Sequence, residues 1–168
     1  SSDVCSSDLG SVQHFAINPS RGPENKPAAL FLSVHGANVE ALNQVRAYSP
    51  KKWGHIVAPT NRRPYGFNWE DWGRMDALEV LDAALREYDI DPDRVYLTGH
   101  SMGGHGTWLL GALFPELFGA IGPSAGWITF WSYKVRHAFE NPSAMEQMLM
   151  RPNLPSDTFA LVRNYGQL

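Results

Sequence analysis

The stretch Gly-His-Ser-Met-Gly, residues 99–103, places a single hydroxyl between two glycines. An apolar run at 95–99 comes before the serine, and a second apolar run follows it. A serine at the tip of such a strand-to-helix turn adopts a strained backbone with positive φ, and its hydroxyl can attack a carbonyl carbon. Side chains at Gly99 and Gly103 would collide as strand and helix converge. The spacing predicts that Ser101 is a nucleophile and that the amide of Met102, at the helix start, faces the oxyanion that forms.

Two other kinds of glycine-rich loop do not fit this stretch. A phosphate-binding loop carries Lys and then Ser or Thr after its last glycine, whereas Gly104 is followed by His105. A dinucleotide fingerprint that starts at Gly104 has Leu109 in place of its third glycine, and one that starts at Gly99 meets Ser101 at its second. The remaining alternative is a plain turn whose serine caps the next helix. A strand before the motif and a helix after it favour the nucleophile.

A second turn, Ser-Val-His-Gly-Ala-Asn at 33–38, ends the first buried strand. In hydrolases with this order of elements, a His-Gly turn after an early strand supplies the second backbone donor to the oxyanion. We expect Ala37 to supply this N–H, and Asn38 is the less favoured choice. The alternative is an ordinary turn that Gly36 allows, with His35 packed beside it.

Strand-like and helix-like segments alternate along the chain. Short apolar runs predict buried strands, at 29–36, 55–60, 95–99 and 118–126. Helical patterns predict helices, at 38–48, 74–88, 103–114, 144–150 and 157–164. A loop rich in Pro, Gly and Trp precedes the second helix, and a turn at 89–94 precedes the third strand. Such alternation requires right-handed crossovers, so we predict an α/β fold, a three-layer α/β/α sandwich around a mainly parallel sheet.

The composition is that of one globular domain. The chain has 168 residues, 43% of them hydrophobic and 18% charged, and its formal net charge is −3. The longest basic clusters are Lys51-Lys52 and Arg62-Arg63, so the charge pattern predicts no nucleic-acid partner. No apolar run reaches the roughly 18 residues that a membrane-spanning helix needs.

The first nine residues, SSDVCSSDL, differ in character from the rest, because Ser-Ser-Asp occurs twice and no periodicity is present. They resemble the translation of a sequencing adapter, and we set 1–9 aside as a non-native leader. Cys5, the single cysteine, lies in this leader, so we assign no thiol chemistry. We expect 10–168 to form a partial domain, with a core at 28–126 and the start of a helical segment at 127–168.

Four stretches together resemble one known family. They are HGAN at 35–38, RRPYGFNWEDWG at 62–73, DPDRVYLTGHSMGGHGTW at 91–108 and FPELFGAIGPSAG at 114–126. With the acid-containing helix behind the aromatic loop, they look like the α/β-hydrolase core of the prolyl-oligopeptidase-like serine peptidases and their esterase relatives. The resemblance runs from about Ala28 to Gly126. It implies that Ser101 is the nucleophile and that Met102 and Ala37 give the oxyanion amides.

In that family the triad aspartate and histidine follow later in the chain, each after a further strand. This sequence departs from that pattern beyond the matched segment, where no apolar strand is followed by an acid. The late candidates are His137, which we interpret as a surface or capping histidine, and Asp157, which we interpret as a helix N-cap. We assign neither to a triad. His100 and His105 flank the motif too closely to reach over Ser101, and we expect both to pack or tune the site.

Metal chemistry has little support, since the six histidines show no His-Glu-x-x-His pattern, and no cofactor is expected. We interpret one group of tryptophans as packing residues and, as a less favoured alternative, as a substrate platform: Trp69, Trp72, Trp127 and Trp131.

The sequence thus predicts a serine hydrolase that cleaves peptide or ester substrates by acyl transfer. The alternative is a non-catalytic binding module of the same fold. We expect this chain by itself to be inactive, because the triad aspartate and histidine are missing from it.

Overall fold

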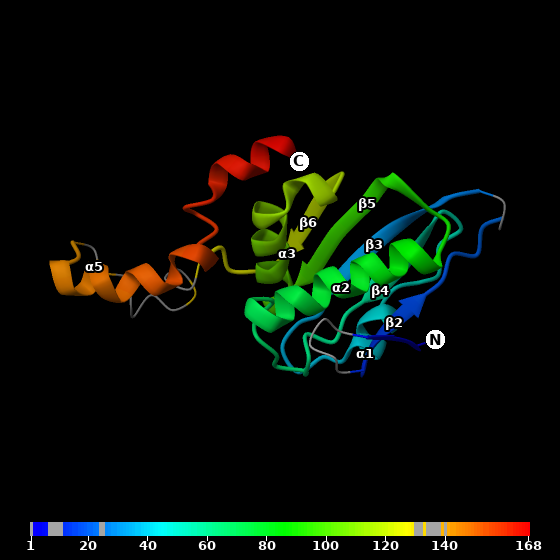
Figure 1. Cartoon of the computed structure of the whole chain (residues 1–168), viewed down its shortest axis with the longest axis horizontal. Helices are drawn as coiled ribbons and strands as arrows, with labels where there is room; N and C mark the ends of the chain where they lie inside the picture. The colour runs from blue at the N-terminus through cyan, green and yellow to red at the C-terminus, as the bar shows by residue number, and fades with distance from the viewer. Residues whose placement is uncertain (1, 7–11, 24–25, 130–132, 134–138, 140) are drawn as a thin grey trace.

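The computed structural model describes residues 2–6, 12–23, 26–129, 133, 139 and 141–168. Within these residues, six strands form one sheet in the order β1-β2-β4-β3-β5-β6. Their bounds are β1 Ser2–Ser6, β2 Val12–Asn18, β3 Ala28–Val34, β4 Gly54–Ala58, β5 Ile90–His100 and β6 Ala120–Ser124. β4, β3, β5 and β6 run parallel, whereas β2 pairs antiparallel with β4 and β1 with β2. The predicted α/β class with a mainly parallel sheet is confirmed (Figure 1).

Helices cover both faces of this sheet, which gives three layers. α2 (Asp71–Glu87) and α3 (Met102–Leu113) lie in front of the sheet in Figure 1, and α1 (Ala41–Arg46) packs on the other face. Strand alternation explains the division. In β4, Val57 belongs to the core under α2 and α3, while Ile56 and Ala58 pack with α1. The predicted three-layer sandwich is confirmed.

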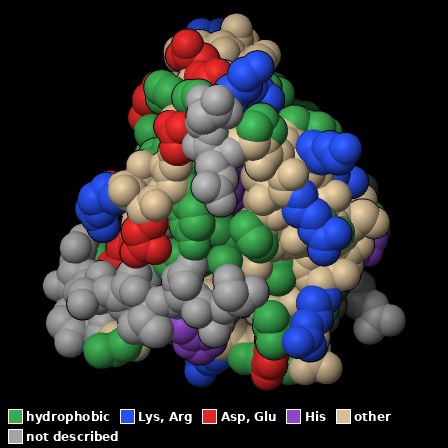
Figure 2. Space-filling model, turned by 90° about the vertical axis from the view of Figure 1, so that its right-hand side faces the viewer, with side chains coloured by type: hydrophobic (Ala, Val, Ile, Leu, Met, Phe, Trp, Pro, Cys, Tyr) green, Lys and Arg blue, Asp and Glu red, His purple; other side chains and the backbone are tan. Residues whose placement is uncertain are grey.

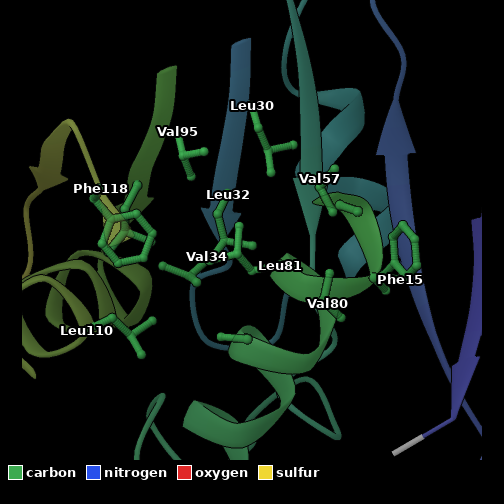
Figure 3. Packing of buried hydrophobic residues seen from close by; sticks show 14 of the residues in the cluster. Phe15, Leu30, Leu32, Val34, Val57, Val80, Leu81, Val95, Leu110 and Phe118 are labelled. Carbon is green, nitrogen blue, oxygen red and sulfur yellow. The ribbon is translucent and has the colours of Figure 1, made fainter. Parts of the chain in front are cut away.

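The larger core fills the space between the sheet and α2 and α3 (Figure 3). Leu30, Leu32 and Val34 of the central strand β3 are fully buried in it. Burial of each such side chain contributes about 1.5–3 kcal/mol. α2 packs closely because its buried face carries mainly small residues, among them Gly73, Ala77, Ala83 and Ala84. This packing holds the carboxyl ends of β3 and β5 side by side.

β5 begins earlier than the sequence predicts. We expected a turn at 89–94, but Ile90 already pairs with Ala28, and the next ladder pair joins Leu30 to Val95. Residues 91–94 therefore lie opposite a single residue of β3, so the expected turn is accommodated as a bulge within the strand. A proline, Pro92, is tolerated here because a bulge needs no ladder N–H.

The two antiparallel strands at the amino end were not predicted. β2 buries Phe15, Ala16 and Ile17 in succession, a run too short to stand out from the surrounding polar residues. The backbone of β1 pairs with β2, although we set residues 1–9 aside from fold reasoning. The non-native origin of that leader stays a prediction.

The carboxyl-terminal segment is α-helical only in part. α5 spans Ala144–Met150 as predicted, and a capping box joins Ser143 to Glu146 at its start. The hydrogen bonds from Ser143 lower the pKa of the Glu146 carboxyl. The α-helix predicted at 157–164 is wrong, since 3-10 helices span Arg151–Ser156 (η3) and Val162–Gln167 (η4). Asp157 accepts the N–H of Phe159 at 3.1 Å and so begins a turn between η3 and η4 rather than an α-helix.

η4 is held against α3 by polar contacts. Asn164 Nδ2 donates to the carbonyl oxygen of Ala112 at 2.7 Å, and the Tyr165 hydroxyl donates to that of Trp108 at 2.7 Å. Burial raises the pKa of Tyr165 to about 12. These tertiary contacts outweigh the local helix preference that the prediction relied on. A further 3-10 helix, η1 (Pro115–Leu117), links α3 to β6.

On the face shown in Figure 2, Lys and Arg side chains are interspersed with Asp, Glu and apolar side chains. In the described part of the chain, no helix is both long enough and apolar enough to cross a membrane.

Candidate active site

Ser101 stands at the carboxyl end of β5, immediately before α3. Its backbone has φ 57° and ψ −118°, the positive φ that the sequence predicts. Its N–H donates to the carbonyl oxygen of Ser124 at 2.9 Å, and its carbonyl oxygen accepts the N–H of His105 at 3.1 Å. The Ser101 side chain does not cap α3. This geometry disfavours the plain capping turn and leaves the hydroxyl at the edge where parallel sheets place ligands.

The two glycines around Ser101 are required by close packing. A Cβ on Gly99 would lie 2.4 Å from the carbonyl oxygen of Gly103 and 2.6 Å from that of Val34. A Cβ on Gly103 would lie 2.0 Å from the Val34 oxygen. No side chain fits at these distances, so strand and helix approach each other as the motif requires.

The predicted second turn lies directly beside Ser101. A Cβ on Gly36 would be 3.8 Å from the Ser101 Cβ. Asn38 has φ 59°, and its N–H donates to the carbonyl oxygen of Pro64 at 3.0 Å. Among the described residues, no hydrogen bond uses the N–H of Ala37. Of the two residues that the sequence suggested, Ala37 therefore has the amide that can still donate.

Trp69 supports this turn from the core side. Its side chain is fully buried, and Nε1 donates to the carbonyl oxygen of His35 at 3.0 Å. The Trp69 ring meets the His35 ring edge-on, with centroids 4.9 Å apart. A Cβ on Gly106 would lie 2.4 Å from the Trp69 ring, so Trp69 also packs tightly on α3. Its φ of 67° is rare for a bulky residue and marks local strain.

A buried polar network anchors the loop that carries Trp69. Asp76 of α2 is fully buried and accepts the N–H of Asn61 at 2.7 Å and the hydroxyl of Thr60 at 3.2 Å. Arg62 Nε lies 3.5 Å from Asp76 Oδ1, and Arg62 Nη2 donates to Glu79 Oε2 at 2.6 Å. Burial raises the pKa of Asp76, while Arg62 and the hydrogen bonds from Asn61 and Thr60 oppose that rise.

Two histidines lie near the motif, His100 at the end of β5 and His105 within α3. His100 is exposed, and its Nδ1 lies 3.2 Å from the Ser124 hydroxyl. His105 is buried, with Nε2 3.3 Å from Glu70 Oε1 and Nδ1 3.1 Å from the carbonyl oxygen of Trp127. No hydrogen bond between described residues joins either ring to Ser101. The expectation of packing roles agrees with these contacts, and His137 lies outside the described residues.

The tryptophans differ in their surroundings. Trp69 is a core residue, whereas Trp72 is 53% exposed. Trp127 stacks on His105, and Trp131 lies outside the described residues.

Sequence reasoning missed the pairing of Glu70 with His105 because no motif links residues 35 positions apart. Within the described residues, no three His, Cys, Asp or Glu side chains gather as a metal-binding group.

Comparison with known proteins places this site in context. Residues 60–156 match the family model described as the prolyl oligopeptidase family. The chain is 31% identical over 137 residues to poly(3-hydroxyalkanoate) depolymerase C of Paucimonas lemoignei, a match that covers 70% of this chain and 32% of that protein. It is 48% identical over 98 residues to poly(3-hydroxybutyrate) depolymerase of Ralstonia pickettii, covering 55% of this chain and 18% of that protein. The chain thus spans about a third or less of the length of these relatives.

The fold is also similar to that of a solved enzyme, the S-formylglutathione hydrolase of Staphylococcus aureus. The TM-score is 0.70 at 15% identity, and the match covers 99% of this chain and 73% of the other. At this level of identity the likeness shows the fold, an α/β-hydrolase sandwich.

Proposed function

Because residues 60–156, more than half of its length, match that family model, the chain belongs to the prolyl oligopeptidase family of serine hydrolases, and we propose that it cleaves carboxylic esters through Ser101. The observation that carries the proposal is the backbone of Ser101, with φ 57° between a parallel strand and a helix. Such strain persists where the surrounding structure enforces it, and it clusters at active sites.

The proposed chemistry is acyl transfer. Ser101 Oγ attacks the carbonyl carbon of the ester, its proton passes to a base, and the tetrahedral oxyanion collapses as the alcohol leaves with a proton. Water then attacks the acyl-enzyme, releases the carboxylic acid and restores the serine. The base and its acidic partner are expected later in the polypeptide, as the family resemblance implies, so we expect the chain by itself to be nearly inactive.

Two backbone amides are suited to the oxyanion. Met102 is the first residue of α3, where N–H groups have no acceptor within the helix. Ala37 lies in the turn beside Ser101, and its N–H is uncommitted among the described residues. Loss of one such donor typically lowers kcat by about 10²–10³. We propose that these two amides form the oxyanion hole.

Relatives favour an ester over a peptide as the substrate. The two curated relatives are named as depolymerases of poly(3-hydroxyalkanoate) and poly(3-hydroxybutyrate), which are polyesters. The family description itself names an oligopeptidase, so a peptide substrate is the second candidate. Both substrates pass through the same tetrahedral oxyanion.

A phosphonate probe that reacts with activated serines tests the proposal. We expect the product of the intact gene to be labelled at Ser101, and the Ser101→Ala variant to lose both the label and p-nitrophenyl ester hydrolysis. A prolyl anilide assayed beside a short-chain ester separates peptidase from esterase. Labelling absent from the wild type, with no turnover of either substrate, would instead indicate a non-catalytic binding module. Rapid labelling of the 168-residue chain would show that it already contains the base.

A further inference from the structure

His105 is a buried titratable side chain that the proposed acyl transfer leaves without a role. It lies in the first turn of α3, and its backbone N–H donates to the Ser101 carbonyl oxygen at 3.1 Å. Its side chain is 0% exposed. The imidazole stacks on the Trp127 indole, with centroids 4.8 Å apart and an interplanar angle of 12°. Its position is therefore fixed relative to the proposed nucleophile.

Both ring nitrogens of His105 face groups that accept hydrogen bonds. Nδ1 lies 3.1 Å from the carbonyl oxygen of Trp127, and Nε2 lies 3.3 Å from Glu70 Oε1. A backbone carbonyl and an ionised carboxylate can only accept. An imidazole N–H donates to either oxygen, so the two contacts hold the ring between the Glu70 carboxylate and the Trp127 carbonyl oxygen.

This pair connects the two halves of the proposed oxyanion hole. Glu70 directly follows Trp69, which packs on α3 at Gly106 and donates to the His35 carbonyl at 3.0 Å. His35 opens the turn that carries Ala37, and α3 begins with Met102. A continuous series of contacts thus runs from α3 through His105, Glu70 and Trp69 to the turn at 35–38.

We propose that His105 and Glu70 are positioning residues, whose side-chain contact fixes the Ala37 turn against the start of α3 and so sets the geometry of the oxyanion hole. The proposal rests on the function proposed for Ser101. It does not place either side chain on the substrate. Because the pair acts through the two amides, its loss reduces stabilisation of the transition state more than binding of the ground state.

Glu70→Gln is the decisive variant, since it keeps the shape of a side chain that is 21% exposed and removes its charge. Glu87→Gln, at the exposed end of α2, is the matched control. Nitrogen-15 NMR of the histidine rings should give the same His105 Nε2 resonance in the wild type and in Glu87→Gln. In Glu70→Gln, the Nε2 resonance should shift, because the contact with the carboxylate is lost.

Kinetics of the intact gene product provide the second measurement, with kcat expressed per serine titrated by the phosphonate. We expect Glu70→Gln and His105→Gln to lower this kcat by roughly tenfold or more, with KM changed by less than about twofold. If His105→Gln does not fold, Glu70→Gln decides. An unchanged His105 Nε2 resonance, or a wild-type kcat, in Glu70→Gln overturns the proposal. A wild type that neither labels nor hydrolyses overturns the proposed function, and the positioning role with it, whatever the NMR spectrum shows.

Discussion

Gly103 lies directly against the carbonyl group of Val34, so closely that a Cβ at position 103 would stand 2.0 Å from the Val34 oxygen and 3.0 Å from the carbonyl carbon of His35. The atoms on the far side of this contact are backbone atoms of the central strand and the turn after it, and neither can turn aside as a side chain can. The helix must shift if the glycine is replaced.

Gly103→Ala should therefore destabilise the protein by about 1–3 kcal/mol or more, because α3 has to move away from β3. The free energy of unfolding in urea measures this loss. Gly166→Ala is the matched control, since no atom of the described residues lies within 4 Å of a Cβ there, and its effect should stay within about 0.5 kcal/mol. Equal stability of the two variants would show that α3 packs less tightly on β3 than these distances indicate.

Trp69→Phe should lower both stability and activity. The substitution keeps most of the ring but removes the N–H that donates to the His35 carbonyl at 3.0 Å, and a buried acceptor left without a donor costs about 1–3 kcal/mol. The turn that carries Ala37 is then held less firmly. Urea unfolding, and kcat of the intact gene product toward a p-nitrophenyl ester, measure the two effects, and Trp72→Phe, at a side chain that is 53% exposed, serves as the control. Unchanged kcat in Trp69→Phe would remove the tryptophan from the support of the site.

Stability should depend on the protonation of Asp76. Burial raises the pKa of this carboxyl above its ordinary 3.8, so the folded protein holds the Asp76 proton more tightly than the unfolded chain does. The stability that Asp76 contributes is therefore present in full below its ordinary pKa, and it is lost as the pH rises through the raised pKa of the folded protein. As the pH rises from the ordinary pKa through the raised pKa, the wild type should lose stability relative to Asp76→Asn.

Urea unfolding of wild type and Asp76→Asn, at several values from about pH 3.5 to about pH 7, measures this difference. The exposed Asp82→Asn on the same helix is the matched control. A difference between wild type and Asp76→Asn that grows in favour of the wild type with rising pH would show that Arg62 and the hydrogen bonds outweigh burial.

The 168-residue chain should bind a hydrophobic dye on the α1 side of the sheet. A cavity of about 460 Å³ lies there, lined by Phe31, Trp53, Tyr96 and Ile121 among others. Trp53 is 51% exposed and meets the Phe31 ring edge-on at 5.3 Å, so Trp53→Gln should reduce the dye fluorescence without unfolding the protein. Trp72→Gln removes an equally exposed tryptophan elsewhere. An equal loss of fluorescence in both variants would place the dye on another surface.

Short sequence patterns predicted the features of this protein that depend on neighbouring residues in the chain. The positive φ of Ser101 and the close packing at Gly99 and Gly103 follow from one pentapeptide, and the strand and helix on either side follow from periodicity. The nucleophilic role of Ser101, and the oxyanion roles of Met102 and Ala37, stay predictions.

What sequence patterns did not reveal depends on contacts between distant segments. The contact of His105 with Glu70 joins residues that belong to no shared motif. The segment at 157–164 has a helical pattern, but the contacts of Asn164 and Tyr165 with α3 hold η4 as a 3-10 helix. The turn at 89–94 was recognised, yet only its pairing with β3 shows that it lies within a strand.

The hydrogen bond from the Ser101 N–H to the Ser124 carbonyl oxygen also determines which backbone groups of β6 face away from β5. The backbone groups of Ser124 face β5, so by strand alternation the backbone groups of Ile121 and Pro123 face away from β5. This side of β6 is unpaired among the described strands. Because proline has no N–H, this side presents one backbone hydrogen-bond donor, from Ile121, instead of two. A foreign strand would find a poor template at this edge. Self-association of the chain at high concentration should accordingly proceed through its apolar surface and give amorphous material rather than ordered fibrils.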